Sequence, residues 1–294
     1  MNNDWVNRQE YAFAPHYFTT TEGQMHYVDE GKGKPIVMVH GTPVWSYVYR
    51  KMIKDLSANY RCIAMDHLGF GLSDKPPLAD YSPQAHAQRL TDLISHLQLE
   101  DITLVVHDFG GPIGLSYTLA QPDQVKQLVI FNTWMWSLNE YPEFVRAGKI
   151  ASSPLGRFLY KYFNFSPKVL IKQAFFDKAK LTKVLQQQYI KAFPDTKTRG
   201  GTIAFAKHLL SSSEWYNSLW QQKEKLKDIA MLILWGKKDT LLTPILLKKW
   251  KENFAHAQIE ELEAGHFVQE EKPAEAIMFI RAFLAKEKTK SLER

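Results

Sequence analysis

The chain has 294 residues, of which 45% are hydrophobic and 23% are charged. These proportions are ordinary for a globular protein and exclude a disordered or low-complexity chain. The longest strongly apolar run covers residues 229–235, far below the roughly 20 residues that span a bilayer. The first residues lack the pattern of a signal peptide, and the single cysteine, Cys62, cannot form an internal disulfide. We therefore expect a cytoplasmic protein without a membrane partner.

The net charge of +6 is unevenly distributed along the chain. Residues 136–230 hold 16 Lys and Arg against 7 Asp and Glu, a net charge of +9, whereas the remainder holds 21 against 24, a net charge of −3. The basic residues are dispersed and no recognition motif accompanies them, so we expect no nucleic-acid partner. The contrast predicts two regions of different character.

Short apolar runs alternate with helical patterns along most of the chain. After a predicted hairpin at 16–20 and 24–29, runs bounded by turn residues predict buried strands at 35–39, 60–65, 102–106, 127–131, 229–235 and 258–263. Helical periodicity is found at 83–99, with Ser82 as N-cap, and at 243–254 and 273–285. This alternation predicts an α/β fold with a mostly parallel, twisted sheet flanked by helices on both faces.

The alternation breaks between the strand at 127–131 and the strand at 229–235. The intervening residues are rich in Lys, Phe and Tyr and show helical patterns without a comparable strand. We interpret 133–228 as a helical domain inserted over one edge of the sheet. The core domain then consists of residues 1–132 and 229–294.

Asp108 is the first candidate for catalysis, because the functional residues of open α/β sheets gather on loops at the carboxyl ends of the strands. It follows a predicted strand and precedes Gly110 and Gly111, which permit a sharp turn into a helix with the apex side chain exposed. The helix dipole stabilises an Asp there as an anion, so it can attack an electrophile without a base to deprotonate it. Simple N-capping is the alternative role.

Three further loops at the same predicted edge carry polar residues. The motif HGTPVWS (40–46) follows the strand at 35–39, and the main-chain N–H groups of Thr42 and Phe109 together would form an oxyanion hole. Asp239 follows the strand that resumes the sheet, and His266 follows the last strand. The chain order of nucleophile, acid and histidine is that of an α/β-hydrolase triad.

These motifs resemble those of haloalkane dehalogenases and epoxide hydrolases, the α/β-hydrolases with an aspartate nucleophile. The resemblance rests on HGTPVWS, AMDHLGFGLSDKP (64–76), VVHDFGGPIG (105–114), WGKKD (235–239) and AGHF (264–267). It covers about residues 16–285 and implies an α/β-hydrolase fold with a helical cap at 133–228. The motifs look closest to the dehalogenases whose third triad member is Asp; other dehalogenases place a Glu where this sequence has Asn132.

Carried over to these positions, the resemblance implies Asp108 as nucleophile, His266 as base and Asp239 as the residue that orients His266. Asp108 would displace a leaving group from an sp³ carbon, and His266 would activate a water to hydrolyse the resulting ester. The reactants would be a small molecule and water. No metal or organic cofactor is implied, and the sequence shows no metal-ligand cluster or phosphate-binding loop.

The sequence departs from this family at the residues that hold the leaving group. Dehalogenases normally have Trp where this chain has Phe109, and Asn or Glu where it has Thr42. Phe lacks a donor and the Thr hydroxyl is a weak substitute, and one lost donor costs roughly 3–4 kcal/mol in comparable sites. Trp134 is the best candidate for a replacement donor, although packing is the simpler role for it and for the nearby tryptophans.

Two other functions compete with carbon–halide hydrolysis. Epoxide hydrolysis would use the same triad with two tyrosine acids on the cap, where Tyr141, Tyr160, Tyr162, Tyr189 and Tyr216 are available. The other alternative is a binding protein without catalysis. Retention of Asp108, Asp239 and His266 argues against it, because a binding scaffold has no need of this set.

Overall fold

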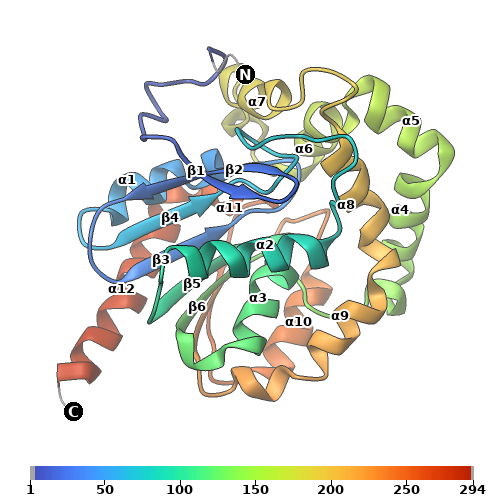
Figure 1. The fold of residues 1–294 in the computed structure, drawn as a ribbon. Helices are drawn as coiled ribbons and strands as arrows, with labels where there is room; N and C mark the ends of the chain where they lie inside the picture. Colours follow the sequence, from blue (N-terminus) through green and yellow to red (C-terminus); the bar gives the residue numbers. More distant parts are fainter. Residues whose placement is uncertain (1–3, 293–294) are drawn as a thin grey trace.

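The computed structural model describes residues 4–292, and its centre is a twisted eight-stranded sheet (Figure 1). The strands are β1 (His16–Thr20), β2 (Gly23–Glu30), β3 (Pro35–Val39), β4 (Arg61–Met65), β5 (Ile102–His107), β6 (Val125–Phe131), β7 (Ala230–Gly236) and β8 (Gln258–Leu262). Their order across the sheet is β1-β2-β4-β3-β5-β6-β7-β8. β2 is antiparallel to both β1 and β4, and all other neighbours are parallel, so the predicted α/β architecture is confirmed.

The central strands are mostly apolar and buried because helices cover both faces of the sheet. Every residue of β5 is buried, and Val37 of β3 lies between Ile63 of β4 and Leu104 of β5. The edge strand β1 instead alternates between half-buried and exposed residues. The strands β4, β3, β5, β6, β7 and β8 are neighbours and all run in one direction. The loops after β3, β5, β6, β7 and β8 therefore meet at one edge.

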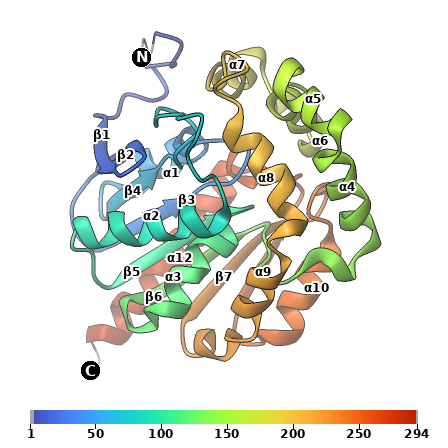
Figure 2. The same ribbon diagram turned by 45° about the vertical axis from the view of Figure 1, so that its right-hand side comes forward.

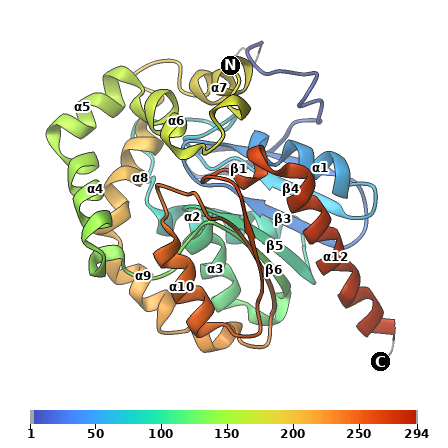
Figure 3. The same cartoon turned by 180° about the vertical axis from the view of Figure 1, so that it is seen from behind.

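Helices from the core segments pack on the two faces of the sheet. They are α1 (Arg50–Leu56), α2 (Pro83–His96), α3 (Gly110–Ala120), α10 (Pro244–Asn253), α11 (Val268–Glu271) and α12 (Pro273–Leu292). α2 and α3 cover the face seen in Figure 1, and α1 and α12 cover the face seen from behind in Figure 3. Ser82 caps α2 as predicted, its hydroxyl accepting the Ala85 N–H at 3.2 Å. α12 runs to Leu292, well beyond the predicted end at residue 285.

The chain leaves the sheet between β6 and β7 and forms a long run of helices (Figure 2). These are α4 (Pro142–Ser152), α5 (Pro154–Phe163), α6 (Ile171–Ala174), α7 (Lys183–Lys191), α8 (Gly200–Ser211) and α9 (Ser213–Trp220), with short helical turns between them. All residues from 133 to 228 are described, and none of them lies in a strand. We call this stretch the helical segment; its status as a separate domain stays a prediction.

The helical segment lies over the edge where the strands end. The indole N–H of Trp45, in the loop after β3, donates to the Gln188 carbonyl of α7 at 3.1 Å. The His266 N–H, in the loop after β8, donates to the Ala174 carbonyl of α6 at 2.8 Å. The loops from the sheet are therefore enclosed by helices on their outer side.

No helix within residues 4–292 combines the length and the apolar character needed to cross a bilayer.

Candidate active site

Asp108 lies at the turn between β5 and α3, in a backbone conformation that residues other than glycine rarely adopt. Its φ is +52°, and it is 7% exposed. The turn is held by Thr133, whose hydroxyl donates to the Asp108 carbonyl, and by the Asp108 N–H, which donates to the Asn132 carbonyl at 3.1 Å. Gly111 is required there, since a Cβ atom on it would lie 1.8 Å from the Thr133 hydroxyl. The turn thus fixes the carboxylate at the edge of the sheet.

One carboxylate oxygen of Asp108 accepts a hydrogen bond from the main chain. The Thr42 N–H donates to Oδ1 at 2.8 Å. Gly41 makes room for this contact, because a Cβ atom on it would lie 2.1 Å from Oδ1. Burial acts to raise the pKa of Asp108, but His266 and the N–H of Phe109 outweigh it and keep this pKa below its ordinary value. Asp108 is therefore an anion at neutral pH.

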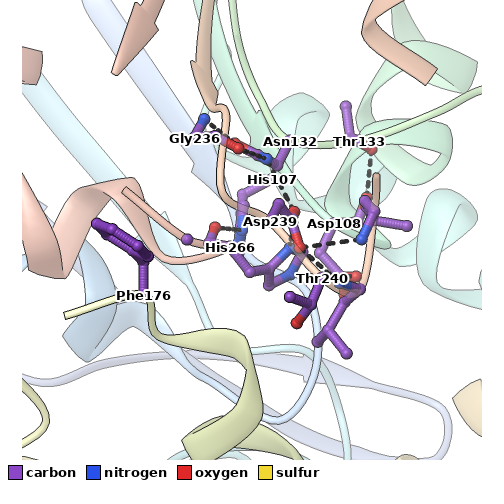
Figure 4. A network of polar contacts seen from close by, with 12 residues as sticks. His107, Asp108, Asn132, Thr133, Phe176, Gly236, Asp239, Thr240 and His266 are labelled. Atoms are coloured by element: carbon purple, nitrogen blue, oxygen red, sulfur yellow. Dashed lines mark hydrogen bonds and ion pairs between the residues drawn. The ribbon is translucent and has the colours of Figure 1, made fainter. Parts of the chain in front are cut away.

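His266 lies between two carboxylates (Figure 4). Its Nδ1 donates to Asp239 Oδ2 at 2.7 Å, which leaves Nε2 directed at Asp108, 3.6 Å from Oδ2. This separation is an ion-pair contact rather than a hydrogen bond. Burial disfavours the imidazolium, but the charges of Asp239 and Asp108 outweigh burial and raise the pKa of His266 to about 10.

Asp239 is fixed by four hydrogen bonds. Its Oδ1 accepts the N–H groups of Leu241 at 2.7 Å and Leu242 at 3.0 Å. Its Oδ2 accepts from His266 and also from the Asn132 amide, at 2.8 Å. Asn132 also exchanges hydrogen bonds with the main chain of Gly236, at 2.8 and 3.2 Å. Sequence reasoning considered Asn132 only as a position without an acid, whereas the structure places it as the residue that holds the acid.

Comparison with known proteins gives the same picture over nearly the full length of the chain. Residues 34–273 match the family described as the alpha/beta hydrolase fold. The chain belongs to this family. It is 32% identical to a cis-3-alkyl-4-alkyloxetan-2-one decarboxylase of Shewanella oneidensis, over 94% of this chain and 90% of the relative. It is 31% identical to haloalkane dehalogenase 2 of Mycobacterium tuberculosis, over 90% of this chain and 93% of the relative.

Among solved structures, this α/β hydrolase is similar to the haloalkane dehalogenase DatA from Agrobacterium tumefaciens. The two superimpose with a TM-score of 0.84 at 27% identity, covering 93% of this chain and 96% of the other. The predicted resemblance to haloalkane dehalogenases is thus confirmed in sequence and in fold. The protein is a dehalogenase-like hydrolase.

Two buried residues outside the predicted set hold the His266 loop of this hydrolase. The Nε2 of His107 donates to the His266 carbonyl at 3.0 Å. Burial and the neighbouring His266 lower the pKa of His107 to about 3, so it is neutral and supports the loop as a hydrogen-bond donor.

Glu271 makes the second support, through three main-chain N–H groups. It accepts from Gly265 at 2.9 Å, from Asp177 at 2.7 Å and from Phe176 at 3.1 Å. Gly265 precedes His266, while Phe176 and Asp177 belong to the helical segment. Glu271 thereby joins the loop that carries His266 to that segment. No short motif in the sequence marks this role, which depends on tertiary contacts.

The opposite side of Asp108 is aromatic. Phe109 stacks on Phe205 of α8 with ring centroids 4.4 Å apart, and meets the edge of Trp134 at 5.0 Å. Trp134 is fully buried, and its indole N–H has no hydrogen-bond partner among the described residues. The hydroxyl of Thr42 is likewise buried and unpartnered there. The structure thus places Thr42 and Phe109 next to Asp108 and Trp134 against Phe109, and two of these predicted residues carry donors without a partner among the described residues.

The tyrosines of the helical segment do not favour epoxide hydrolysis. Tyr162 is 55% exposed, and the hydroxyl of Tyr189 is bound to the Glu270 carboxylate. The Tyr216 hydroxyl donates to the His208 carbonyl at 2.9 Å. Tyr160 is buried, and burial together with the Asp108 charge raises its pKa. The same two causes raise the pKa of Tyr216, but its hydroxyl proton is held by the His208 carbonyl, and Tyr141 is half-buried.

Proposed function

We propose that this hydrolase cleaves the carbon–halogen bond of haloalkanes through an ester on Asp108, with His266 as base and Asp239 as its orienting acid. The observation that carries the proposal is the difference in hydrogen bonding between the two carboxylate oxygens of Asp108. Oδ1 is bound by the Thr42 N–H, whereas Oδ2 is free of hydrogen bonds to the described residues and lies beside His266. One oxygen is ready to attack, and the other already occupies an oxyanion site.

In the first step, Oδ2 attacks the carbon that carries the halogen. The new bond is an ester C–O bond, and the halide leaves with the electrons of the carbon–halogen bond. Asp108 is already ionised and held in place, so the step needs no prior proton transfer. The ester that forms is neutral, and the negative charge has moved to the halide.

In the second step, water attacks the Asp108 carbonyl carbon while the Nε2 of His266 takes a proton from it. Esterification prepares this step, because the loss of the Asp108 charge removes one of the two influences that raise the pKa of His266. The oxyanion develops on Oδ1, where the N–H groups of Thr42 and Phe109 stabilise it. The alcohol leaves with one proton, a second proton is lost to solvent, and Asp108 is restored.

The departing halide requires hydrogen-bond donors, and we assign this role to the Trp134 indole and the Thr42 hydroxyl. Both groups are buried and have no hydrogen-bond partner among the described residues; Trp134 packs against Phe109, and Thr42 contacts Asp108 through its N–H. An unpaired buried donor costs free energy in the resting enzyme, and a halide that receives its hydrogen bond relieves that cost in the transition state. Trp134 would then replace the donor that Phe109 lacks.

The direct test is turnover of bromoalkanes. We expect the wild-type enzyme to release bromide and alcohol in equal amounts. A His266→Phe variant, which keeps a ring but cannot activate water, should accumulate the alkyl ester on the peptide that contains Asp108, detected by mass spectrometry. Absence of bromide release from short and long bromoalkanes, together with no adduct in the variant, would overturn the proposal.

A second candidate is the opening of 3,4-dialkyl-oxetan-2-ones, favoured by the name of the Shewanella relative and by the missing donor at Phe109. Asp108 would attack ring carbon 4, which bears an alkyl group and the ring oxygen, and break its bond to that oxygen. The carboxylate that leaves stays attached to the substrate through carbon 3. Cleavage of the ester C–O bond and the adjacent C–C bond would then release carbon dioxide and an alkene and restore Asp108. Alkene and carbon dioxide from an oxetanone, with no bromide from bromoalkanes, would favour this reaction over dehalogenation.

A further inference from the structure

Helix α5 presents an apolar face to solvent. Leu155, Phe158, Tyr162 and Phe163 are 67%, 49%, 55% and 56% exposed. The ring of Phe158 contacts the other two aromatic rings, with its centre 5.0 Å from that of Tyr162 and 5.8 Å from that of Phe163. A surface helix normally turns its apolar side inward, and contiguous exposed apolar side chains mark interaction sites.

The exposure of these side chains is fixed by the ends of the helix. The Ser153 hydroxyl caps the first turn by accepting the Gly156 N–H at 3.0 Å. At the other end Asn164 adopts a left-handed conformation, with φ of +52°, and its amide donates to the carbonyls of Ile190 and Phe193 at 3.2 and 3.1 Å. Because Tyr160 on the opposite side is buried, α5 cannot turn its apolar face inward without losing these contacts.

The same region carries a concentrated positive charge. Residues 144–176 contain six basic side chains and no acidic one. All six are exposed, and none forms a salt bridge within the described residues: Arg146, Lys149, Arg157, Lys161, Lys168 and Lys172. Ile150 and Val169, which precede and follow α5 in the chain, are also exposed, at 64% and 38%. We call residues 144–176 the α4–α5 face.

Exposed apolar side chains together with unpaired basic side chains favour one kind of partner over the others. A second copy of the chain would bring two positive faces together, and like charges repel. A nucleic acid would pair with the basic side chains but would leave Leu155 and Ile150 against water. An anionic lipid surface satisfies both features, since its headgroups pair with Lys and Arg while apolar and aromatic side chains enter the interface.

We propose that the α4–α5 face docks this hydrolase peripherally on an anionic lipid bilayer. The sequence-based expectation of no membrane partner rested on the lack of a spanning segment, which a peripheral contact does not need. α4 and α5 form the outer edge of the molecule, remote from the sheet, in both Figure 1 and Figure 3. Since the inner side of α5 carries buried Tyr160, docking brings lipid within one helix diameter, about 10 Å, of the enclosed interior. Apolar substrates dissolved in the bilayer would thus be concentrated at the enzyme.

The test is co-sedimentation of the whole protein with vesicles of phosphatidylcholine, with and without phosphatidylglycerol. We expect binding to the anionic vesicles, little binding to the neutral ones, and release in about 1 M salt, where the screening length is about 3 Å. Two variants, Phe158→Ser with Tyr162→Ser and Arg157→Glu with Lys161→Glu, should each lower the vesicle partition coefficient by about tenfold or more. Their thermal midpoints should match that of the wild type, because the altered side chains are exposed.

The matched control is Leu78→Ser with Lys32→Glu, which changes an exposed apolar and an exposed basic residue outside the α4–α5 face. It should bind anionic vesicles as the wild type does. The proposal is overturned if the wild type does not bind anionic vesicles, or if the control loses as much binding as the variants. It is also overturned if the wild type is a dimer that Phe158→Ser with Tyr162→Ser dissociates, or if duplex DNA binds more tightly than the vesicles.

Discussion

The two sides of Asp108 are built on opposite principles. On the side of His266 and Asp239, buried polar atoms are held by hydrogen bonds that come mostly from loops of the sheet. On the side of Phe109, the walls are aromatic and two of them, Trp134 and Phe205, come from the helical segment. The Trp134 indole N–H and the Thr42 hydroxyl on this side have no hydrogen-bond partner among the described residues. Under the proposed function, the side of His266 and Asp239 would carry out ester formation and hydrolysis, while the side of Phe109 and Trp134 would accept the leaving group.

The most severe change to the polar side is Asp108→Asn. It keeps the size of the side chain and removes the nucleophilic charge, so we expect bromide release to fall by at least about 10³-fold. Initial rates measured at enzyme concentrations above those of the wild-type assay would quantify the loss. A variant with an unchanged thermal midpoint and more than a tenth of the wild-type rate would contradict the role given to Asp108.

The next largest effect is expected from Asp239→Asn, which removes the charge that stabilises the His266 cation. Hydrolysis of the ester should slow by about 10²- to 10⁴-fold, whereas ester formation should change much less. Stopped-flow measurement of the halide burst separates the two steps. Asn132 already contacts Asp239 Oδ2, so a further Asn132→Asp change should restore part of the lost rate; equal slowing of both steps would count against this assignment.

On the aromatic side, Trp134→Phe removes the indole donor and retains most of the ring volume. We expect ester formation from bromoalkanes to slow by about ten- to a hundredfold, with ester hydrolysis unchanged. Trp136→Phe is the matched control, because Trp136 is equally buried but packs on Trp220 and Trp250. Similar kinetics in the two variants would show that Trp134 acts only in packing.

Phe109→Trp tests the same aromatic side by adding a hydrogen-bond donor instead of removing one. It supplies a donor beside the nucleophile, and we expect a severalfold gain in turnover of bromoalkanes if leaving-group stabilisation limits the rate. Chloroalkanes, whose leaving group is poorer, should gain more than bromoalkanes in the same assay. No gain with either substrate would contradict the donor argument.

The smallest expected change is a shift in a titration. The pKa of His266, about 10 in the resting enzyme, is raised partly by the charge of Asp108, so Asp108→Asn should lower it. In turnover the base must be neutral in the ester state, so activity should rise with pH through the lowered pKa. Histidine NMR of the variant measures the shift, and a pKa equal to or above that of the wild type would refute the coupling.

The sequence was sufficient to predict those parts of the site that local pattern determines. Asp108, Asp239 and His266 each follow a short apolar strand, and parallel strands bring their following loops together at one edge. The roles of Asn132 and Glu271 could not be predicted, because each acts on residues far away in the chain. The stacking of Phe205 on Phe109 depends in the same way on how the helical segment packs.

The two ends of α2 show the same difference between what a local pattern predicts and what it does not. The start of α2 was predicted from Ser82, whose capping role is local. Its end was predicted at residue 99, but the helix ends at His96, and Gln98 adopts a positive φ of 50°. Residues 96–101 contain no glycine, the residue that commonly marks a helix end.

The central claim, a covalent ester on Asp108, is tested most directly by a single turnover in H₂¹⁸O with enzyme in excess over a bromoalkane. The oxygen of the alcohol then derives from Oδ2 of Asp108, and water supplies the oxygen that replaces it in the carboxylate. We predict an unlabelled alcohol and one heavy oxygen in the peptide that contains Asp108. A labelled alcohol with an unlabelled Asp108 would show that water attacks the substrate directly, and would contradict the account.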